Sequence, residues 1–326
     1  MWVLMASLPP IDWHLARGIA RPLTGDVPVV SRPQAVAVVA DLRLRAQRAG
    51  ALALEASELD SRPADRVVVV DRAGWTTAMS RMVQQVLGRI DLPRRTGWPH
   101  RLAGLGYGLT IGGGLGLFSR YLLGQYDAFS DDPALYLVAP NILAQERSRH
   151  FVPRDFRLWV AAHEQTHALQ TNAAPWTARY LLRRFEIVAR DDLTAAGLAR
   201  GLATGGPGAI GWLGGDTDQA LEEITALMTL LEGHADLIAD RLGTKEIPSV
   251  RQLRRAFARG DSGGLIARHL PVADKSAQYR DGLSFCRAVV RSVKVAGLNA
   301  AFAGPEFLPT GSELRTPASW VKRVHG

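Results

Sequence analysis

The residues of this chain whose types and spacing could do chemistry are two histidines and a glutamate. The segment His163-Glu164-Gln165-Thr166-His167 has the form HExxH. On a helix, positions i and i+4 are about 400° apart, so the two imidazoles project from one face and can bind one zinc ion. The carboxylate of Glu164 would then lie beside the metal, where it can take a proton from a metal-bound water. The motif therefore predicts metal-assisted hydrolysis of a peptide, with Glu164 as the general base.

A catalytic zinc site needs a third protein ligand and one position open to water. The best candidates lie in residues 216–242, which have the pattern of one long helix with acidic residues at its start. Glu232 and Asp236 are four residues apart there, so one can bind the metal while the other accepts a hydrogen bond from a zinc-binding histidine. His234 is the competing ligand. It lies about 200° around the helix from Glu232, so only one of these two can face the zinc. Without a third ligand, the two histidines would be ordinary residues of an amphipathic helix.

The order Glu232-Gly233-His234-Ala235-Asp236 resembles the glutamate zincins, in which HExxH is completed by a glutamate with an aspartate four residues later. This resemblance implies Glu232 as the third zinc ligand and Asp236 as the acceptor behind a ligand histidine. It implies that His234 packs between helices or lies outside the ligand shell. Because Gly233 has no side chain, it would allow two helices to approach closely at the metal. The candidate donors to an oxyanion are Tyr279, Tyr180 and His234.

Longer segments resemble one bacterial family. They are residues 159–170 (WVAAHEQTHALQ), 230–236 (LLEGHAD), 123–127 (LGQYD) and 135–142 (LYLVAPNI). The chain looks like a member of an uncharacterised zincin-like family, mainly actinobacterial. Its members are described as zinc-dependent metalloproteases or as proteins associated with biosynthesis of the deazaflavin coenzyme. The resemblance implies a mostly helical, metalloprotease-like fold. Because the coenzyme link reflects which genomes carry the family, it implies no reaction.

The elements that must position these residues are mostly helical. Helices are expected near residues 12–22, 33–59, 74–91, 114–126, 154–172, 175–190, 216–242, 249–259 and 273–296. Residues 66–71 and 134–139 are the main β candidates. The predicted fold class is mainly α with a small β-sheet (α+β), a zincin-like fold in a single domain over residues 1–326. A helical part up to residue 100 would pack on a metal-binding core of residues 101–300, and an extended tail from Ala303 would be docked by aromatic residues.

Three segments carry finer predictions. In zincins generally a sheet-edge strand lies beside the active-site helix, so Leu135, Tyr136, Leu137 and Val138 are predicted to hold an extended peptide substrate. An ordinary interior strand is the alternative. Residues 201–215 are Gly-rich and could form a flap over the cleft or a plain loop. Residues 103–119 are apolar and Gly-rich, but shorter than the roughly 20 residues that span a bilayer. A buried helix hairpin or loop is expected there, with weak membrane association as the alternative, and no transmembrane segment is predicted.

The composition is typical of an intracellular globular enzyme. The chain has 326 residues, and 47% of them are hydrophobic, which is ample for a core. The net charge of +8 comes from arginines spread along the chain, so no specific nucleic-acid binding is expected. The single cysteine, Cys286, excludes an intramolecular disulfide and is expected to be buried. Met1 to Leu8 lacks the basic start and the length of a signal peptide, so a cytoplasmic location is expected.

The function that these patterns favour is that of a zinc-dependent metallopeptidase with one catalytic Zn²⁺ and a peptide or protein substrate. Two alternatives come from other classes of protein. The metal could stabilise a catalytically silent scaffold. The chain could also bind a partner or a small molecule in deazaflavin coenzyme metabolism.

Overall fold

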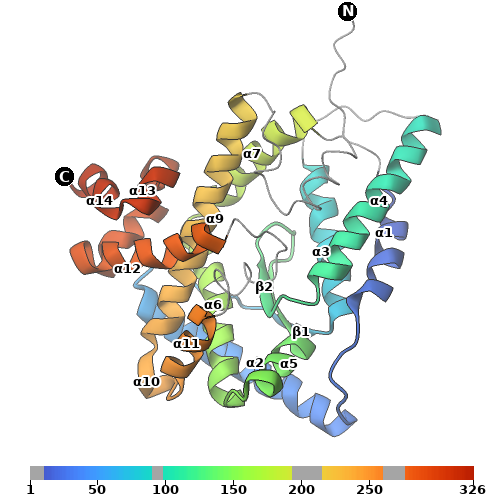
Figure 1. Ribbon diagram of the computed structural model, residues 1–326, viewed down its shortest axis with the longest axis horizontal. Helices are drawn as coiled ribbons and strands as arrows, with labels where there is room; N and C mark the ends of the chain where they lie inside the picture. The colour runs from blue at the N-terminus through green and yellow to red at the C-terminus, as the bar shows by residue number, and fades with distance from the viewer. Residues whose placement is uncertain (1–10, 90–97, 193–214, 260–275) are drawn as a thin grey trace, which may run out of the picture.

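The computed structural model describes residues 11–89, 98–192, 215–259 and 276–326 of the chain. Helices dominate these residues, and one three-stranded sheet lies among them (Figure 1). This confirms the predicted fold class. The helices are α1 (Trp13–Ala20), α2 (Arg32–Ser57), α3 (Arg72–Gly88), α4 (Trp98–Phe118), α5 (Ala139–Arg149), α6 (Pro153–Ala173), α7 (Trp176–Asp192), α9 (Gly215–Arg241), α10 (Gly243–Glu246), α11 (Val250–Arg259), α12 (Ser276–Leu298), α13 (Gly311–Arg315) and α14 (Pro317–His325). Short 3-10 turns are η1 (Pro22–Thr24), η4 (Asn299–Phe302) and η5 (Pro305–Phe307), and the strands are β1 (Val67–Val70), β2 (Gly124–Asp127) and β3 (Ala134–Val138).

The sheet has the order β1-β3-β2, with β3 in the centre. β3 pairs in parallel with β1 and antiparallel with β2. The prediction that Leu135, Tyr136, Leu137 and Val138 form a sheet edge is therefore wrong, and the interior-strand alternative holds. The strand at the sheet edge next to α6 is β2. Its residues 124–127 follow α4 and pair with β3. Sequence patterns assigned part of this segment to a helix over residues 114–126.

The Gly-rich stretch at residues 103–119 lies almost wholly within one helix, α4, and not in a hairpin. α1 packs on α4, and glycines lie in the contact. A Cβ atom at Gly112 would come 2.3 Å from the carbonyl oxygen of Ala16, and one at Gly116 would come 2.6 Å from that of Ala20. Glycine at every fourth position thus lets the α1 backbone lie directly on α4. Among the described residues, no helix is both long and apolar enough to cross a membrane.

The C-terminal tail is helical over much of its length, and not extended as predicted. Thr310 caps α13 in a capping box, and Pro317 occupies the first turn of α14, so local signals favour helices here. The predicted aromatic anchor is confirmed at Trp320, which is fully buried. Its ring centroid lies 5.6 Å from that of Phe285 on α12, and its Nε1 donates to the carbonyl oxygen of Phe307 at 2.8 Å.

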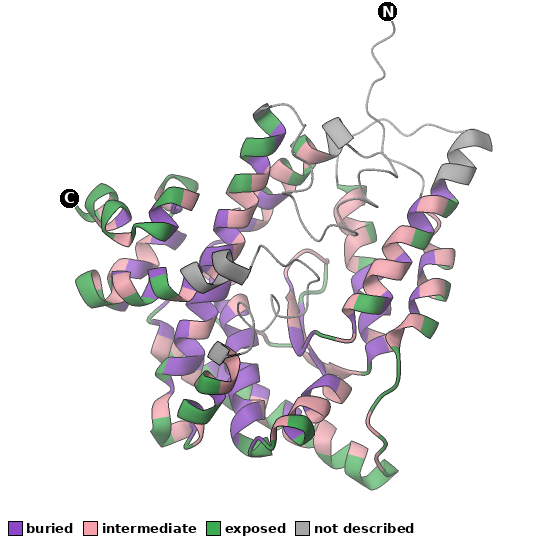
Figure 2. Cartoon of the chain, in the orientation of Figure 1, coloured by how far each residue is buried: buried purple, intermediate pink, exposed green. Residues whose placement is uncertain are grey.

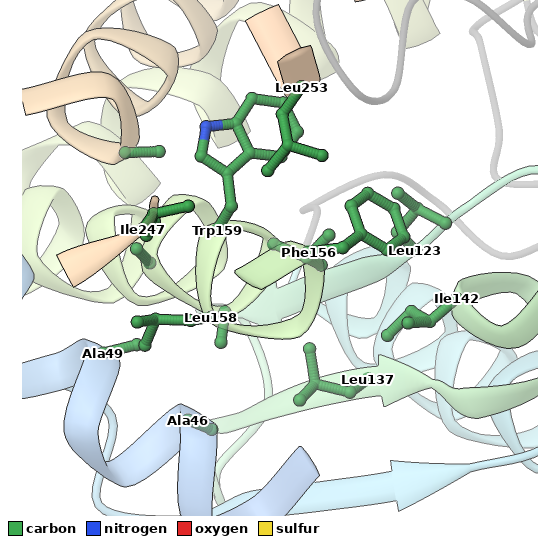
Figure 3. Close-up of a cluster of buried hydrophobic side chains, with 14 of the residues drawn as sticks. Ala46, Ala49, Leu123, Leu137, Ile142, Phe156, Leu158, Trp159, Ile247 and Leu253 are labelled. Atoms are coloured by element: carbon green, nitrogen blue, oxygen red, sulfur yellow. The ribbon is translucent and has the colours of Figure 1, made fainter. Parts of the chain in front are cut away.

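α6 lies at the centre of a hydrophobic core (Figure 3). The core contains Ala46, Ala49, Leu137, Ile142, Phe156, Leu158, Trp159, Ile247 and Leu253. Most of α6 is buried, whereas the peripheral helices keep an exposed face (Figure 2). A helix that is buried on nearly all sides is fixed by its neighbours from every direction. The segments predicted as the two metal helices are confirmed as α6 and α9, and they pack against each other.

Candidate metal centre

α6 and α9 bring the three predicted zinc ligands together. α6 carries His163 and His167 one turn apart, and α9 carries Glu232. The Nε2 atoms of the two histidines lie 3.2 Å apart. Glu232 places Oε2 at 3.4 Å from Nε2 of His163 and Oε1 at 3.5 Å from Nε2 of His167. One ligand atom of each residue lies within 4.8 Å of the others, so the three could hold a single metal ion.

The other ring nitrogen of each histidine has its own partner. Nδ1 of His163 lies 3.0 Å from Oδ1 of Asp236, the residue predicted for this contact. Nδ1 of His167 lies 2.9 Å from Oε1 of Gln170. Oε1 of Gln170 can accept a hydrogen bond from Nδ1 of His167, which leaves the lone pair of that ring on Nε2. The contact of His163 with Asp236 is an ion pair without hydrogen-bond geometry. The Nε2 atoms of both rings face Glu232.

Glu164 lies in the wall of the same site. Its side chain is fully buried, and neither carboxylate oxygen has a hydrogen-bond partner among the described residues. Gly124 of β2 lies directly against it. A Cβ atom at Gly124 would come 2.7 Å from Cγ of Glu164 and 2.9 Å from the carbonyl oxygen of Tyr136. The sheet edge therefore fixes where the carboxylate of Glu164 can lie.

The donor set fits a catalytic zinc ion. Two imidazole nitrogens and a carboxylate oxygen are typical zinc ligands, and three protein ligands leave the fourth tetrahedral position for water. Within the described part of the chain, Oε2 of Glu232 and both oxygens of Glu164 are buried without a hydrogen bond. Buried polar atoms normally have partners. A cation with an associated water would supply the partners that these oxygens lack.

The buried groups of the site shift one another's pKa values. Burial lowers the pKa of His167. Burial opposes charge on His163 as well, but hydrogen bonds to Asp236 and Glu232 outweigh it and raise the pKa of His163 well above its ordinary value. The pKa of Glu232 is lowered, because the two histidines outweigh the effect of burial. Burial raises the pKa of Glu164 to about 8, against the influence of His163. A carboxyl group that titrates near neutral pH can both accept and return a proton, as a general base must.

His234 is not one of the converging ligands. It is fully buried, and its Nδ1 lies 3.0 Å from Nε2 of Gln170. Its ring packs edge-on against Phe302, with centroids 5.1 Å apart. Burial lowers the pKa of His234 to about 3, and the neighbouring His167 adds to this shift, so the ring is neutral. The structure thus places His234 behind His167, where it packs between elements outside the ligand shell, and not beside the ligand atoms.

Of the two tyrosines considered as oxyanion donors, Tyr180 lies elsewhere. Its hydroxyl donates to Glu223 at 3.3 Å, and Glu223 precedes Glu232 by about 13 Å along α9. The side chain of Tyr279 lies outside the described residues, so its role stays a prediction. The predicted flap at residues 201–215 also lies outside them, except for Gly215 at the start of α9.

Sequence patterns did not point to Gln170 or Gly124. Gln170 follows His167 by three residues, which places the two on one helix face, and this spacing is the signal that could have indicated it. The contact between Gly124 and Glu164 depends on how β2 crosses α6, for which no local signal exists. The close helix approach predicted at Gly233 is confirmed, although α12 makes it. A Cβ atom there would come 2.2 Å from the carbonyl carbon of Gly282.

An open cavity of about 540 Å³ lies beside the C-terminal part of α6, and none of the proposed metal ligands lines it. Thr171 at the end of α6, Tyr126 of β2 and Arg62 before β1 are among the residues that line it. Thr171 follows His167 by one helical turn, and Tyr126 lies on the same face of β2 as Gly124. The cavity is therefore bordered by the elements that carry His167 and Gly124.

The zincin-like metallopeptidase family matches this chain over residues 11–321. The match covers nearly the whole sequence, so the chain belongs to this family. Membership implies a bound metal, typically zinc, and the cluster of His163, His167 and Glu232 could bind it. The resemblance seen in the sequence motifs is confirmed at the level of this family.

A solved structure from Chloroflexus aurantiacus, described as a candidate hydrolase with a novel fold, is similar to this chain. The two chains are 26% identical in sequence, and the comparison covers 97% of this chain and 99% of the other, with a TM-score of 0.70. No curated protein matches. The family match supports a zincin-like fold, and the family and the similar structure both point to a hydrolase as the class of enzyme.

Proposed function

We propose that this chain is a zinc-dependent peptidase of the cytoplasm, with His163, His167 and Glu232 as zinc ligands and Glu164 as general base. One observation carries the proposal. Three ligand atoms from two helices converge beside a fully buried carboxylate that has no hydrogen-bond partner in the described part of the chain. Buried groups without partners are disfavoured in a purely structural role, and they are common where a protein binds metal and water.

The residues of the site divide the work of hydrolysis. Bound zinc would polarise the scissile carbonyl group and lower the pKa of water. Asp236 and Gln170 hold the two imidazoles so that each Nε2 faces the ligand position. Glu164 would take the proton of the attacking water and pass it to the leaving nitrogen of the peptide. Burial raises the pKa of Glu164 in the metal-free protein, and the positive charge of a bound zinc ion would favour the ionised carboxylate that accepts the proton.

The substrate is proposed to be a peptide or a protein segment in extended form. Among the residues that the structure describes, β2 pairs with a strand on one side only, and its other side is a sheet edge next to α6. An extended peptide can add to such an edge by main-chain hydrogen bonds. Gly124 would place the scissile bond near Glu164, and the cavity at Tyr126 and Thr171 would take a side chain of the substrate.

The test is hydrolysis of a peptide library by the wild-type protein and by Glu164→Gln, with zinc content measured for both. Glu164→Gln keeps the shape of the side chain and removes the base, so cleavage should fall by about 100- to 10,000-fold. Zinc content should not change, because the ligands are intact. If the wild-type protein binds one zinc per chain and cleaves no peptide, a silent scaffold or a binding protein linked to coenzyme metabolism would explain the site better. Equal cleavage by both proteins would exclude Glu164 as the base.

A further inference from the structure

The amide of Gln170 connects a proposed zinc ligand to a buried histidine. Its Oε1 lies 2.9 Å from Nδ1 of His167. Its Nε2 donates to the carbonyl oxygen of Leu231 at 2.8 Å and lies 3.0 Å from Nδ1 of His234. Gln170 is 1% exposed and His234 is fully buried. Each polar atom of this amide therefore has a partner within the protein.

The carbonyl group of Leu231 determines which end of the amide faces the metal site. A carbonyl oxygen can only accept a hydrogen bond, so the atom of Gln170 beside it must be the NH₂ group. The second hydrogen of this group serves Nδ1 of His234, which must accept. The amide oxygen then has to face Nδ1 of His167, which must donate. As a result, the lone pair of His167 lies on Nε2, the nitrogen 3.5 Å from Glu232.

We infer that Gln170 and His234 are positioning residues, which together set the tautomer and the ring orientation of His167 for metal binding. This inference rests on the proposed zinc site. Leu231 directly precedes Glu232. The turn of α9 that supplies the proposed ligand Glu232 therefore also orients His167, through Gln170. His234 in turn is held by Phe302, whose ring packs against it. Nδ1 of His167 thus faces the neutral amide of Gln170, whereas Nδ1 of His163 faces the carboxylate of Asp236.

Gln165 offers a matched control for Gln170. It lies on the same helix and is also 1% exposed. Its Oε1 accepts from the backbone N–H of Ala64 at 2.8 Å, and its Nε2 donates to the carbonyl oxygen of Ala46 at 3.0 Å. Gln165→Met and Gln170→Met thus remove the same kind of buried amide, but only the second removes the acceptor for a proposed metal ligand. Both variants should lower the free energy of unfolding of the metal-free protein by a similar amount.

The experiment measures the zinc dissociation constant of each protein by competition with a chromophoric chelator. Loss of a group that orients a metal-binding histidine typically weakens metal binding by about 10- to 100-fold. We expect this range for Gln170→Met and a change of less than about threefold for Gln165→Met. The visible absorption spectrum of the cobalt(II)-loaded protein should change only in Gln170→Met. Equal zinc affinity for wild type and both variants, or equal weakening in both variants, would overturn the inference.

His234 is tested by a second pair of variants. His234→Phe removes the acceptor at Nδ1 and keeps a ring, whereas His234→Asn can place its side-chain oxygen where Nδ1 lies. Zinc affinity should fall by about 10-fold in His234→Phe and recover in His234→Asn. If His234→Asn binds zinc as weakly as His234→Phe, the accepted hydrogen bond is not what His234 contributes. A wild-type protein that binds no zinc would contradict the proposed function itself, which separates that failure from the failure of this inference.

Discussion

Gly124→Ala tests how closely the sheet edge fixes the general base. The added Cβ atom would lie 2.7 Å from Cγ and 2.8 Å from Cδ of Glu164, and 2.9 Å from the backbone oxygen of Tyr136. Since the backbone of β3 is held on both sides, the carboxylate must yield. It has to move by about 0.7 Å to reach the 3.4 Å at which ordinary van der Waals contact begins. A displacement of about 1 Å can slow a reaction about 100-fold, so we expect kcat to fall roughly 10- to 100-fold.

The assay for this variant is hydrolysis of the best peptide from the library, with zinc content and urea unfolding measured on the same preparation. Zinc content should stay at the wild-type level, because the atoms nearest to the added Cβ atom belong to Glu164 and Tyr136 and not to a proposed ligand. Overpacking should lower the free energy of unfolding by about 1–3 kcal/mol. Gly113→Ala on α4 is the control, since its Cβ atom would meet nothing within 4 Å. Hydrolysis by Gly124→Ala at the wild-type rate would refute the argument that Gly124 positions Glu164.

Removal of zinc by a chelator should abolish hydrolysis and lower the thermal unfolding midpoint, because a ligand at about 1,000 times its Kd stabilises the folded state by about 4 kcal/mol. An unchanged midpoint would argue against a metal between α6 and α9. In the metal-free protein, burial raises the pKa of Glu164 from 4.5 to about 8, so the folded state favours the protonated form. This stabilisation is complete at pH values below the pKa of Glu164 in the unfolded chain, and it is lost as the pH rises through the pKa of Glu164 in the folded protein, about 8. Glu164→Gln should therefore raise the free energy of unfolding by on the order of a few kcal/mol at high pH, and the gain should shrink towards acid pH; urea unfolding that shows a constant gain would contradict this. Gly112→Ala should lower the free energy of unfolding by at least about 1–3 kcal/mol, because its Cβ atom would lie 2.3 Å from the carbonyl oxygen of Ala16. Gly113→Ala should not lower the free energy of unfolding in this way. Equal urea midpoints for the two variants would show that the packing of α1 on α4 does not require glycine at position 112.

Two pairs of candidate site residues could be predicted because the geometry within each pair is local. His163 and His167 share a helix face by their spacing alone, and so do Glu232 and Asp236, wherever the helices lie. The choice between Glu232 and His234 was not local, because it depends on how α9 is rotated against α6. The resemblance to glutamate zincins supplied the prediction of Glu232, and in the structure Glu232 faces both Nε2 atoms.

Contacts between distant segments were not accessible from local patterns. β2 has four residues, too few to show the alternation that marks a strand, so its place at the sheet edge was missed. α5 follows β3 without a connecting residue. Pro140 lies in the first turn of α5, and sequence patterns did not predict that a helix begins there. The glycines of α4 each lower helix propensity by about 1 kcal/mol. They are retained in a helix because α1 packs on the surface that they leave free, and this packing involves residues almost a hundred positions away.

The most direct test of the central claim is the anomalous scattering of a crystal of the zinc-loaded protein, measured at the zinc absorption edge. The account predicts one zinc per chain, bound by Nε2 of His163, Nε2 of His167 and a carboxylate oxygen of Glu232, with a non-protein ligand in the remaining position. A zinc ion bound by His234 in place of Glu232, closed off by a fourth protein ligand, or found away from α6 and α9 would contradict it.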